Sequence, residues 1–253
     1  MSGAAGLVAA VVQARMTSSR LPGKILLPLA GKPLLYRMLE RVKRIAGVDK
    51  VVLALAEGAA HDAAVEAVSG LDVLVVRGSE QDVLARTAKA AREARADTVM
   101  RITSDCPLLD PGVSATILQA YADGIGDGLR YARTAIDRGF PLGFDTEVFS
   151  SQLLYEADET STDPYEREHT TPYIWRRPER IRQMVITGSP DHRNWRLVVD
   201  TADDYKLAGA VYGELYPSNP QFAHPELIEL FESQPDLLRI NAHVEQRPYV
   251  GLA

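Results

Sequence analysis

The sequence predicts an α/β fold with a doubly wound, mostly parallel sheet. Several short runs are rich in Val and Leu and do not alternate with polar residues, which is typical of parallel strands covered on both faces. Segments with helical periodicity lie between these runs. Strands that alternate with helices indicate right-handed βαβ crossovers, and ligands of such sheets bind beyond the carboxyl ends of the strands.

The clearest pattern lies in the first part of the chain. Strands are expected at residues 7–14, 50–55, 72–77 and 98–102. A helix is expected at 33–45, where apolar residues recur at helical spacing and Arg and Glu take the other face. Further helices are expected at 62–68 and 82–95, and each begins with an acidic residue that can cap it.

The second half of the chain is less regular. Turns are expected at 124–128 and 139–143, and helices at 201–215 and 225–233. The sequence contains no internal repeat, no low-complexity segment and no strong domain boundary. Residues 1–253 are therefore expected to form a single domain, with a small inserted substrate lobe at about 129–183.

The composition is ordinary for a globular protein, with 46% hydrophobic and 25% charged residues in a chain of 253. A net charge of −6 disfavours a nonspecific nucleic-acid binder, which needs a broad basic surface. The single cysteine, Cys106, excludes an internal disulfide and a CxxC zinc site. No apolar stretch is long enough to span a bilayer. The early apolar run is followed directly by Gln13 and Arg15, which is typical of a buried strand and not of a signal peptide. A cytoplasmic protein without nucleic-acid or membrane partners is expected.

The segment 13–24 follows the first expected strand and carries three cations, Arg15, Arg20 and Lys24, with three hydroxyls and a glycine. Backbone N–H groups in such a loop, together with Arg and Lys side chains, suit a triphosphate. Any one of these Arg side chains alone would be interpreted as an ordinary surface cation, but the cluster at the end of a strand favours a binding site. The segment is not a Walker A loop, because Ile25 follows Lys24 where that loop has Ser or Thr.

Asp105 lies just beyond the strand expected at 98–102. A carboxylate in this place can hold Mg²⁺ against phosphate oxygens, although Asp105 could instead be a turn residue before Pro107. The neighbouring Cys106 is interpreted as a small buried side chain and not as a nucleophile.

Asp200 follows a short strand expected at 196–199 and precedes an expected helix. Thr201 and Asp204 fit a capping box in which Asp replaces Glu, so capping explains these two residues and leaves Asp200 available as a metal ligand. Parallel strands end at the same edge of a sheet. Asp105 and Asp200 are therefore expected to meet at one magnesium site.

Several motifs occur together in one order along nearly the whole chain. They are Ala14-Arg15, Ser18, Arg20-Leu21-Pro22-Gly23-Lys24, Gly31-Lys32-Pro33-Leu34, Gly78-Ser79-Glu80-Gln81-Asp82-Val83-Leu84, Asp105-Cys106-Pro107-Leu108, Glu168-His169 with Thr171-Pro172-Tyr173, and Val199-Asp200-Thr201. In this set the sequence resembles the acylneuraminate and deoxy-octulosonate cytidylyltransferase superfamily, and most closely its SpsF-type, spore-coat-polysaccharide branch. The resemblance implies a fold of the nucleotide-diphospho-sugar transferase type.

The resemblance also implies a reaction. CMP would pass from CTP to a small acidic or phosphorylated acceptor with release of pyrophosphate and with Mg²⁺ as cofactor, to supply activated precursors of surface polysaccharide or glycan. The implied catalytic residues are Arg15, Lys24, Asp105 and Asp200, with Asp105 and Asp200 as metal ligands. The implied nucleotide-binding residues are Ala14, Arg15, Ser18, Arg20, Lys24, Gln81, Asp82 and Asp105. The implied acceptor-binding residues are Asp145, Glu147, Arg167 and His169.

Alternatives remain open at this stage. Ser104 stands where the superfamily often has Gly, which affects the expected backbone approach to the nucleotide. The acceptor residues could instead form a surface ion-pair network, and His169 could act as a base or only bind the acceptor. UTP or GTP could replace CTP, and a catalytically silent nucleotide or sugar-phosphate sensor is the competing class of function. Superfamily members are frequently dimers, so the resemblance also suggests a homodimer.

Overall fold

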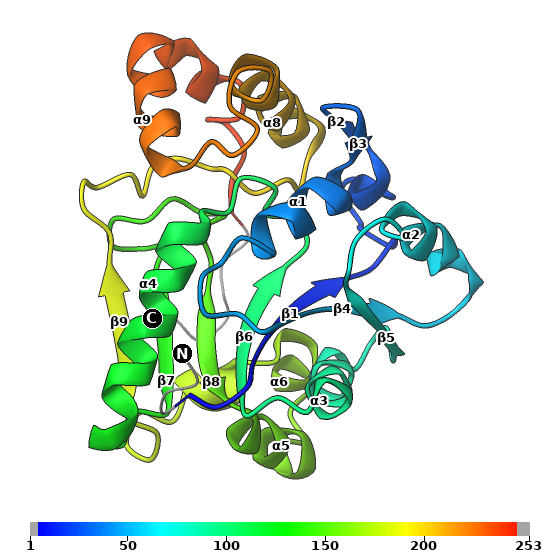
Figure 1. Ribbon diagram of the computed structural model, residues 1–253, viewed down its shortest axis with the longest axis vertical. Helices are drawn as coiled ribbons and strands as arrows, with labels where there is room; N and C mark the ends of the chain where they lie inside the picture. Colours follow the sequence, from blue (N-terminus) through cyan, green and yellow to red (C-terminus); the bar gives the residue numbers. More distant parts are fainter. Residues whose placement is uncertain (1–4, 247–253) are drawn as a thin grey trace.

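Strand β1 (Val8–Ala14) lies in the middle of the sheet, and all seven of its residues are buried. It pairs in parallel with β4 (Lys50–Ala56) on one side and with β6 (Thr98–Thr103) on the other. Strand β5 (Leu74–Gly78) continues the parallel arrangement beyond β4. These four strands confirm the sequence prediction. The computed structural model describes residues 5–246 (Figure 1).

Three later strands extend the same sheet, so that its order is β5-β4-β1-β6-β8-β7-β9. Strand β8 (Glu147–Ser150) is antiparallel to both β6 and β7 (Tyr131–Ala135), and β9 (Gln183–Thr187) is parallel to β7. The segment 129–183 therefore contributes the strands β7 and β8 to the central sheet. Its expected role in acceptor binding stays a prediction.

Alternate residues of the strands face two separate apolar layers. One face packs against α1 (Leu34–Val42), α2 (Asp62–Ala67) and α4 (Pro111–Gly124). The other face packs against α3 (Val83–Ala94), α5 (Ser151–Thr160) and α7 (Pro172–Trp175), with α6 (Pro164–His169) beside α3. Both faces are covered, as the Val-rich and Leu-rich strands require.

A third apolar cluster lies beyond the carboxyl ends of the parallel strands (Figure 1). It is built on α8 (Ala202–Leu215), α9 (His224–Ser233) and the 3₁₀ helix η4 (Pro235–Arg239). The third apolar cluster covers one part of the sheet edge at which ligands are expected.

Shorter elements complete the description: η1 (Lys24–Leu26), β2 (Pro28–Leu29), β3 (Lys32–Pro33), η2 (Ala59–His61) and η3 (Ile125–Asp127).

The prediction of a strand at residues 196–199 is wrong. Arg196 makes only an isolated bridge to Leu142, and the segment that follows is extended without belonging to a strand. Its backbone pairs with loops instead, since Leu197 N donates to Leu142 O at 2.7 Å and Val199 N donates to Asp105 O at 2.7 Å. These hydrogen bonds, and not a place in the sheet, position the residues before α8.

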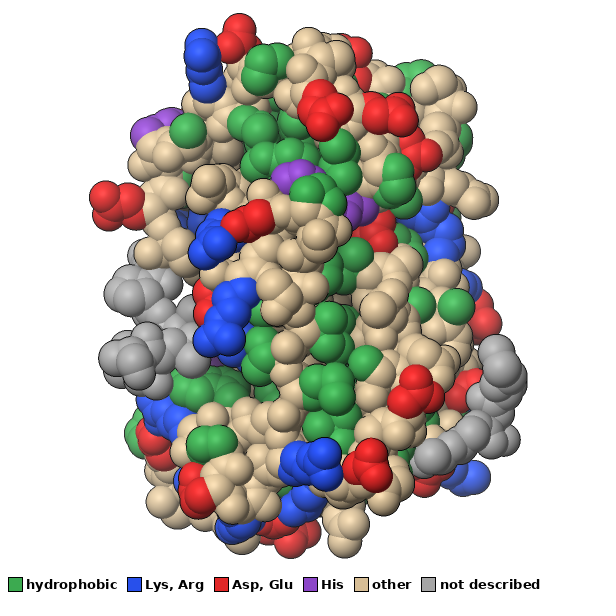
Figure 2. Space-filling model, turned by 90° about the vertical axis from the view of Figure 1, so that its left-hand side faces the viewer, with side chains coloured by type: hydrophobic (Ala, Val, Ile, Leu, Met, Phe, Trp, Pro, Cys, Tyr) green, Lys and Arg blue, Asp and Glu red, His purple; other side chains and the backbone are tan. Residues whose placement is uncertain are grey.

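The strand β9 lies at one edge of the sheet and exposes Met184 and Val185, whose exposed fractions are 39% and 38%. Figure 2 faces this side of the molecule and shows hydrophobic side chains gathered along its middle.

Within residues 5–246, no helix combines the length and the apolar character that a membrane crossing requires.

A buried ion pair anchors the beginning of α8. Arg196 Nε donates to Asp204 Oδ1 at 2.8 Å, and the side chain of Asn241 donates to the same oxygen at 2.8 Å. Asp204 and Thr201 also form the predicted capping box. Burial opposes the charge of Asp204, but Arg196 and Asn241 outweigh it and lower the pKa of this carboxyl group.

We expect Asp204→Ala to lower the free energy of unfolding by about 3–5 kcal/mol, because it removes the closer of the two carboxylates that pair with the buried Arg196. Asp203→Ala is the matched control, since Asp203 lies on the same turn and forms a more exposed ion pair with Lys206. Its loss should stay below about 1 kcal/mol. Urea unfolding followed by circular dichroism measures both, and equal losses would contradict the anchoring role of Asp204.

Candidate functional site

A cleft of about 280 Å³ opens at the carboxyl ends of the parallel strands β1 and β6, beside the beginning of α8. Eight of the residues that the sequence singled out line it: Ala14, Arg15, Ser18, Arg20, Lys24, Asp105, His169 and Asp200. Seven further residues complete its lining: Gln13, Ser19, Val83, Arg86, Thr103, Ser104 and Glu168. The structure thus gathers in one cavity residues from widely separated parts of the chain.

The ammonium group of Lys24 joins the two aspartates of the cleft. Its Nζ lies 2.9 Å from Asp105 Oδ2 and 2.8 Å from Asp200 Oδ1, and it also donates to Val199 O at 2.7 Å. Burial opposes the charged form of Lys24, but the two carboxylates outweigh it and raise the pKa of the ammonium group. Burial would likewise raise the pKa of Asp105, whereas Lys24 and a hydrogen bond with Thr103 lower it. Lys24 and Asp105 are therefore both charged at neutral pH.

Two arginines contact the same carboxylate oxygen of Asp200. Arg20 Nη2 lies 2.7 Å from Asp200 Oδ2, and Arg196 Nη2 lies 3.3 Å from the same oxygen. Arg15 has an exposed side chain and makes no ion pair within the described part of the chain. Arg15 is therefore the cation of the loop that is most readily available to an incoming anion.

The loop between β1 and η1 is held by residues from two neighbouring connections. Met16 N donates to His61 Nδ1 at 3.1 Å, and Thr17 donates to Glu80. Gly23 has a φ of 69°, which L side chains rarely adopt, and its N–H donates to Met16 O at 2.9 Å. The loop is thus fixed at both ends before any ligand binds.

The structure adds residues that sequence reasoning missed. Arg86, on α3, lines the cleft and donates to Ser79 O, while burial and the neighbouring Arg15 lower the pKa of Arg86 to about 10. The buried His61 positions the first loop. Each of the two follows the carboxyl end of an expected strand, which is the signal that could have identified them. Cys106 is buried and its pKa is raised by that burial, which confirms it as an unreactive core residue.

Gln81 and Asp82, expected near the nucleotide, do not line the cleft. Asp82 caps α3 by accepting a hydrogen bond from Ala85 N at 2.9 Å, and it pairs with Arg167 at 2.6 Å. Its contacts with the base stay a prediction. The next residue along α3, Val83, does line the cleft.

The four expected acceptor residues are not gathered at one surface. His169 lines the cleft, whereas Arg167 is engaged by Asp82 and by Asp158, the latter at 3.0 Å. Glu147 accepts hydrogen bonds from Arg101 and Tyr131 in a largely buried polar chain. Of the two alternatives from the sequence, acceptor binding or an ion-pair network, Arg167 therefore takes part in an ion-pair network.

Asp145 lies in the loop before β8, and its carboxylate accepts a hydrogen bond from Gly143 N at 2.8 Å. Gly143 has a φ of 109°, and a Cβ there would lie 2.7 Å from the backbone carbon of Leu197, so only glycine fits. Burial raises the pKa of Asp145 to about 6, and the nearby charges of Glu147 and Asp105 act in the same direction.

His169 is held next to the cleft by an unusual turn. Thr170 has a φ of 71° and a ψ of −57°, and Thr171 N donates to His169 O at 2.8 Å, which is a γ-turn that a β-branched residue adopts only under strain. The Thr170 hydroxyl accepts a hydrogen bond from the buried Gln13 at 2.9 Å. Burial lowers the pKa of His169, aided by neighbouring arginines, so this imidazole is neutral at pH 7.

The donor set of the cleft suits a metal ion that arrives with its substrate. Among residues 5–246 no cluster of three or more His, Cys, Asp or Glu side chains forms a metal cage. Asp105 and Asp200, however, provide two carboxylates on one ammonium group. Mg²⁺ is usually bound by one or two carboxylates with substrate phosphates as further ligands, so these residues fit it.

Residues 9–215 match the protein family described as Cytidylyltransferase. Spore coat polysaccharide biosynthesis protein SpsF of Bacillus subtilis (strain 168) is 32% identical over 234 residues, which cover 89% of this chain and 94% of the relative. A 3-deoxy-manno-octulosonate cytidylyltransferase of Anaeromyxobacter sp. (strain K) is 36% identical over 124 residues, or 47% of this chain and 48% of the relative. The solved structure of a cytidylyltransferase from Leptospira borgpetersenii serovar Hardjo-bovis (strain JB197) has a TM-score of 0.87 at 31% identity, covering 96% of this chain and 98% of that one.

Asp145→Asn tests the electrostatic cost of burying Asp145 in the metal-free protein. Because the pKa of Asp145 rises from 3.8 to about 6 on folding, the folded state holds a proton that the unfolded state releases in this window, and stability falls as pH rises through it. We expect Asn to remove this loss and to raise the free energy of unfolding at pH 7 by roughly 1–3 kcal/mol. Thermal unfolding between pH 4 and pH 8 measures the effect. Parallel stability curves for the two proteins would contradict it.

Proposed function

The chain belongs to the cytidylyltransferase family and has the fold of the nucleotide-diphospho-sugar transferases, and from this premise we propose that it transfers CMP from CTP to a small acidic or phosphorylated acceptor. The observation that carries the proposal is the cluster of Lys24, Asp105 and Asp200 at the mouth of a cleft that also contains Arg15 and Arg20. Cations for a triphosphate and carboxylates for its metal ion thus lie in one place.

The proposed step is an in-line attack by an acceptor oxygen on the α-phosphorus of CTP, with pyrophosphate as the leaving group. Arg15 and Arg20 would bind the phosphates through planar, two-pronged contacts. Positioning and charge neutralisation would supply most of the acceleration, so no nucleophilic side chain is needed.

Lys24 has a further part in this proposal. Its ammonium group has three protons, and Asp105, Asp200 and Val199 O accept all three. Lys24 must therefore exchange at least one partner before it can bind a phosphate oxygen. Mg²⁺, held by Asp105 and Asp200, would supply neutralisation of the phosphate charge.

The acceptor is proposed to enter on the side of His169, which lines the cleft. A carboxylate or phosphate acceptor is already an anion and needs little help from a base, whereas a neutral His169 can accept a proton from a hydroxyl group. The names of the SpsF and 3-deoxy-manno-octulosonate relatives support a sugar-type acceptor and a role in polysaccharide synthesis. A cytoplasmic location and a homodimer remain part of the proposal.

Nucleotide selectivity is the first test. In calorimetric titrations with Mg²⁺, we expect CTP to bind at least about tenfold more tightly than UTP, GTP or ATP, a difference of about 1.4 kcal/mol. Arg15→Gln should weaken the binding of all four to a similar extent, because Arg15 is proposed to contact only phosphates. Equal affinity of the wild-type protein for a purine triphosphate would contradict the assignment to CTP.

The second test concerns the paired aspartates. An acceptor is first found by screening acidic and phosphorylated metabolites. Asp105→Asn and Asp200→Asn keep the shape of the side chain and remove its charge. We therefore expect the rate of CTP-dependent pyrophosphate release to fall by about 10²–10⁴-fold in each variant. The double variant should lose little more than either single one, since both serve one site. Asp203→Asn, outside the cleft, is the matched control. Wild-type turnover in either variant would exclude the shared metal site, and CTP binding without turnover for any acceptor would favour the sensor.

A further inference from the structure

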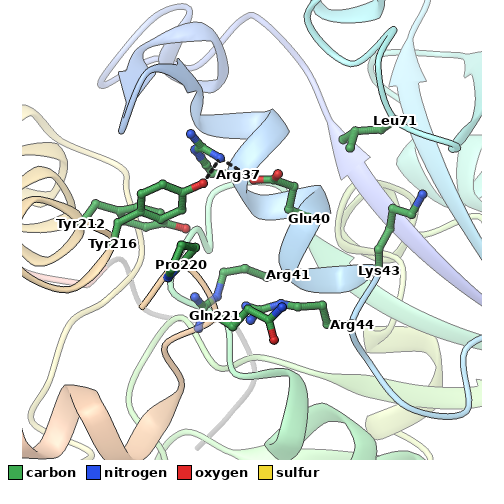
Figure 3. Close-up of a pocket in the computed structure, with 10 residues that line it drawn as sticks. All are labelled: Arg37, Glu40, Arg41, Lys43, Arg44, Leu71, Tyr212, Tyr216, Pro220 and Gln221. Atoms are coloured by element: carbon green, nitrogen blue, oxygen red, sulfur yellow. Dashed lines mark hydrogen bonds and ion pairs between the residues drawn. The ribbon is translucent and has the colours of Figure 1, made fainter. Parts of the chain in front are cut away.

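A second pocket, of about 320 Å³, lies between α1 and the carboxyl-terminal half of α8, and none of the residues that line the catalytic cleft lines it (Figure 3). The wall formed by α1 and the residues just after it carries four cations, Arg37, Arg41, Lys43 and Arg44, and one carboxylate, Glu40. Tyr212 of α8 and Tyr216, which follows that helix, form the facing wall. The volume is in the range of small-molecule sites.

One of the four cations is already satisfied. Arg37 Nη1 lies 2.7 Å from Glu40 Oε2 and 2.6 Å from the Tyr216 hydroxyl, and its Nε donates to Leu29 O at 3.2 Å. Glu40 is thereby neutralised as well. Apart from Glu40, no carboxylate of residues 5–246 lines the pocket to pair with Arg41, Lys43 or Arg44, although Lys43 Nζ donates to the backbone Asp72 O at 3.2 Å.

Arg41 is buried without full compensation. It is 2% exposed, its Nε donates to Leu109 O at 2.7 Å, and its guanidinium lies 4.5 Å from the centre of the Phe222 ring. Its Nη2 has no hydrogen-bond partner in the structure of residues 5–246, and the nearby Tyr212 hydroxyl gives its own proton to Pro107 O at 2.8 Å. Burial lowers the pKa of Arg41, and the adjacent Arg44 lowers it further.

An unpaired buried guanidinium group is costly, and it becomes favourable when an anion lies against it. Figure 3 shows the side chains of Arg41, on α1, and Arg44, just after it, extending toward Gln221 on the same side of the pocket. Arg offers two parallel donors that match the oxygens of a phosphate group, and Lys adds a mobile point charge. Three cations without an ion-pair partner in the pocket suit a dianion better than a single carboxylate.

We propose that the pocket between α1 and α8 binds a small phosphate-bearing anion, held by Arg44 and Lys43 and compensating the charge of Arg41. The pocket also touches the loop that carries Asp105, because Arg41 donates to Leu109 O and Tyr212 donates to Pro107 O. Occupancy of the pocket would stabilise this loop and thereby change the rate of nucleotidyl transfer. The effect on rate rests on the function proposed above, but the binding itself does not.

The test is a calorimetric titration of the full chain with inorganic phosphate, without nucleotide or metal ions. Because the catalytic cleft also contains cations, Arg15→Gln is used to weaken any binding there. In that background, Arg44→Gln and Lys43→Gln should each weaken the remaining phosphate binding by about tenfold. Arg44 is only partly buried and Lys43 is exposed, so both variants should fold. Arg239→Gln lines neither cavity and is the control for loss of one positive charge.

Phosphate binding that Arg44→Gln and Lys43→Gln leave unchanged would overturn the proposal, as would the loss of all binding in Arg15→Gln alone. A parallel titration with glycerol 3-phosphate distinguishes an organic phosphate ester from inorganic phosphate as the anion that the pocket binds. Tighter binding of the ester supports an organic phosphate, and equal binding supports inorganic phosphate. None of these measurements needs turnover, so the proposal can fail while nucleotidyl transfer is confirmed, and the reverse.

Discussion

The shared ammonium group of Lys24 is the interaction on which the rest of the site depends. It brings the loop after β1, the end of β6 and the segment before α8 to one point, because its three protons go to Asp105, Asp200 and Val199 O. Two aspartates this close would repel each other without a cation between them. Burial strengthens the attraction between Lys24 and the two aspartates, because water screens buried charges poorly. The loss of one of these charges is therefore more destabilising than it would be at the surface. The cleft is therefore electrostatically organised before a ligand arrives.

The carboxyl-terminal layer serves this centre in two ways. The ion pair between Arg196 and Asp204 fixes the first turn of α8, and the backbone N–H of Asp200 donates to Asp204 at 3.0 Å. At the other end of the helix, Tyr212 reaches the loop that follows Asp105. One rigid helix thus connects the cleft to the basic pocket, and side chains at both ends contact segments that carry the paired aspartates.

The sequence was most informative where strands are buried on both faces. Strands β1, β4, β5 and β6 were predicted because short, uninterrupted apolar runs between helical segments are typical of the inner strands of a parallel sheet. The later strands were missed because β8 has only four residues and most of β9 is exposed, so neither shows such a run. Asp105 and Asp200 were placed together correctly, yet the reason given for Asp200 was wrong, since Val199 bonds to Asp105 O from a loop. His61 and Arg86 belong to the site through tertiary contacts, and their only signal in the sequence is that each follows an expected strand.

The distance along the chain between the partners of Lys24 has a consequence for biosynthesis. Lys24 and Asp105 are 81 residues apart, but Lys24 and Asp200 are 176 residues apart. A chain that emerges from the ribosome can pair β1, β4, β5 and β6 early, while the ammonium group lacks its second carboxylate until α8 has been made. The nascent protein therefore passes through a stage in which the four parallel strands are present but Lys24 lacks one of its two carboxylate partners. Truncated translation products would retain the parallel strands without the assembled cluster of charges.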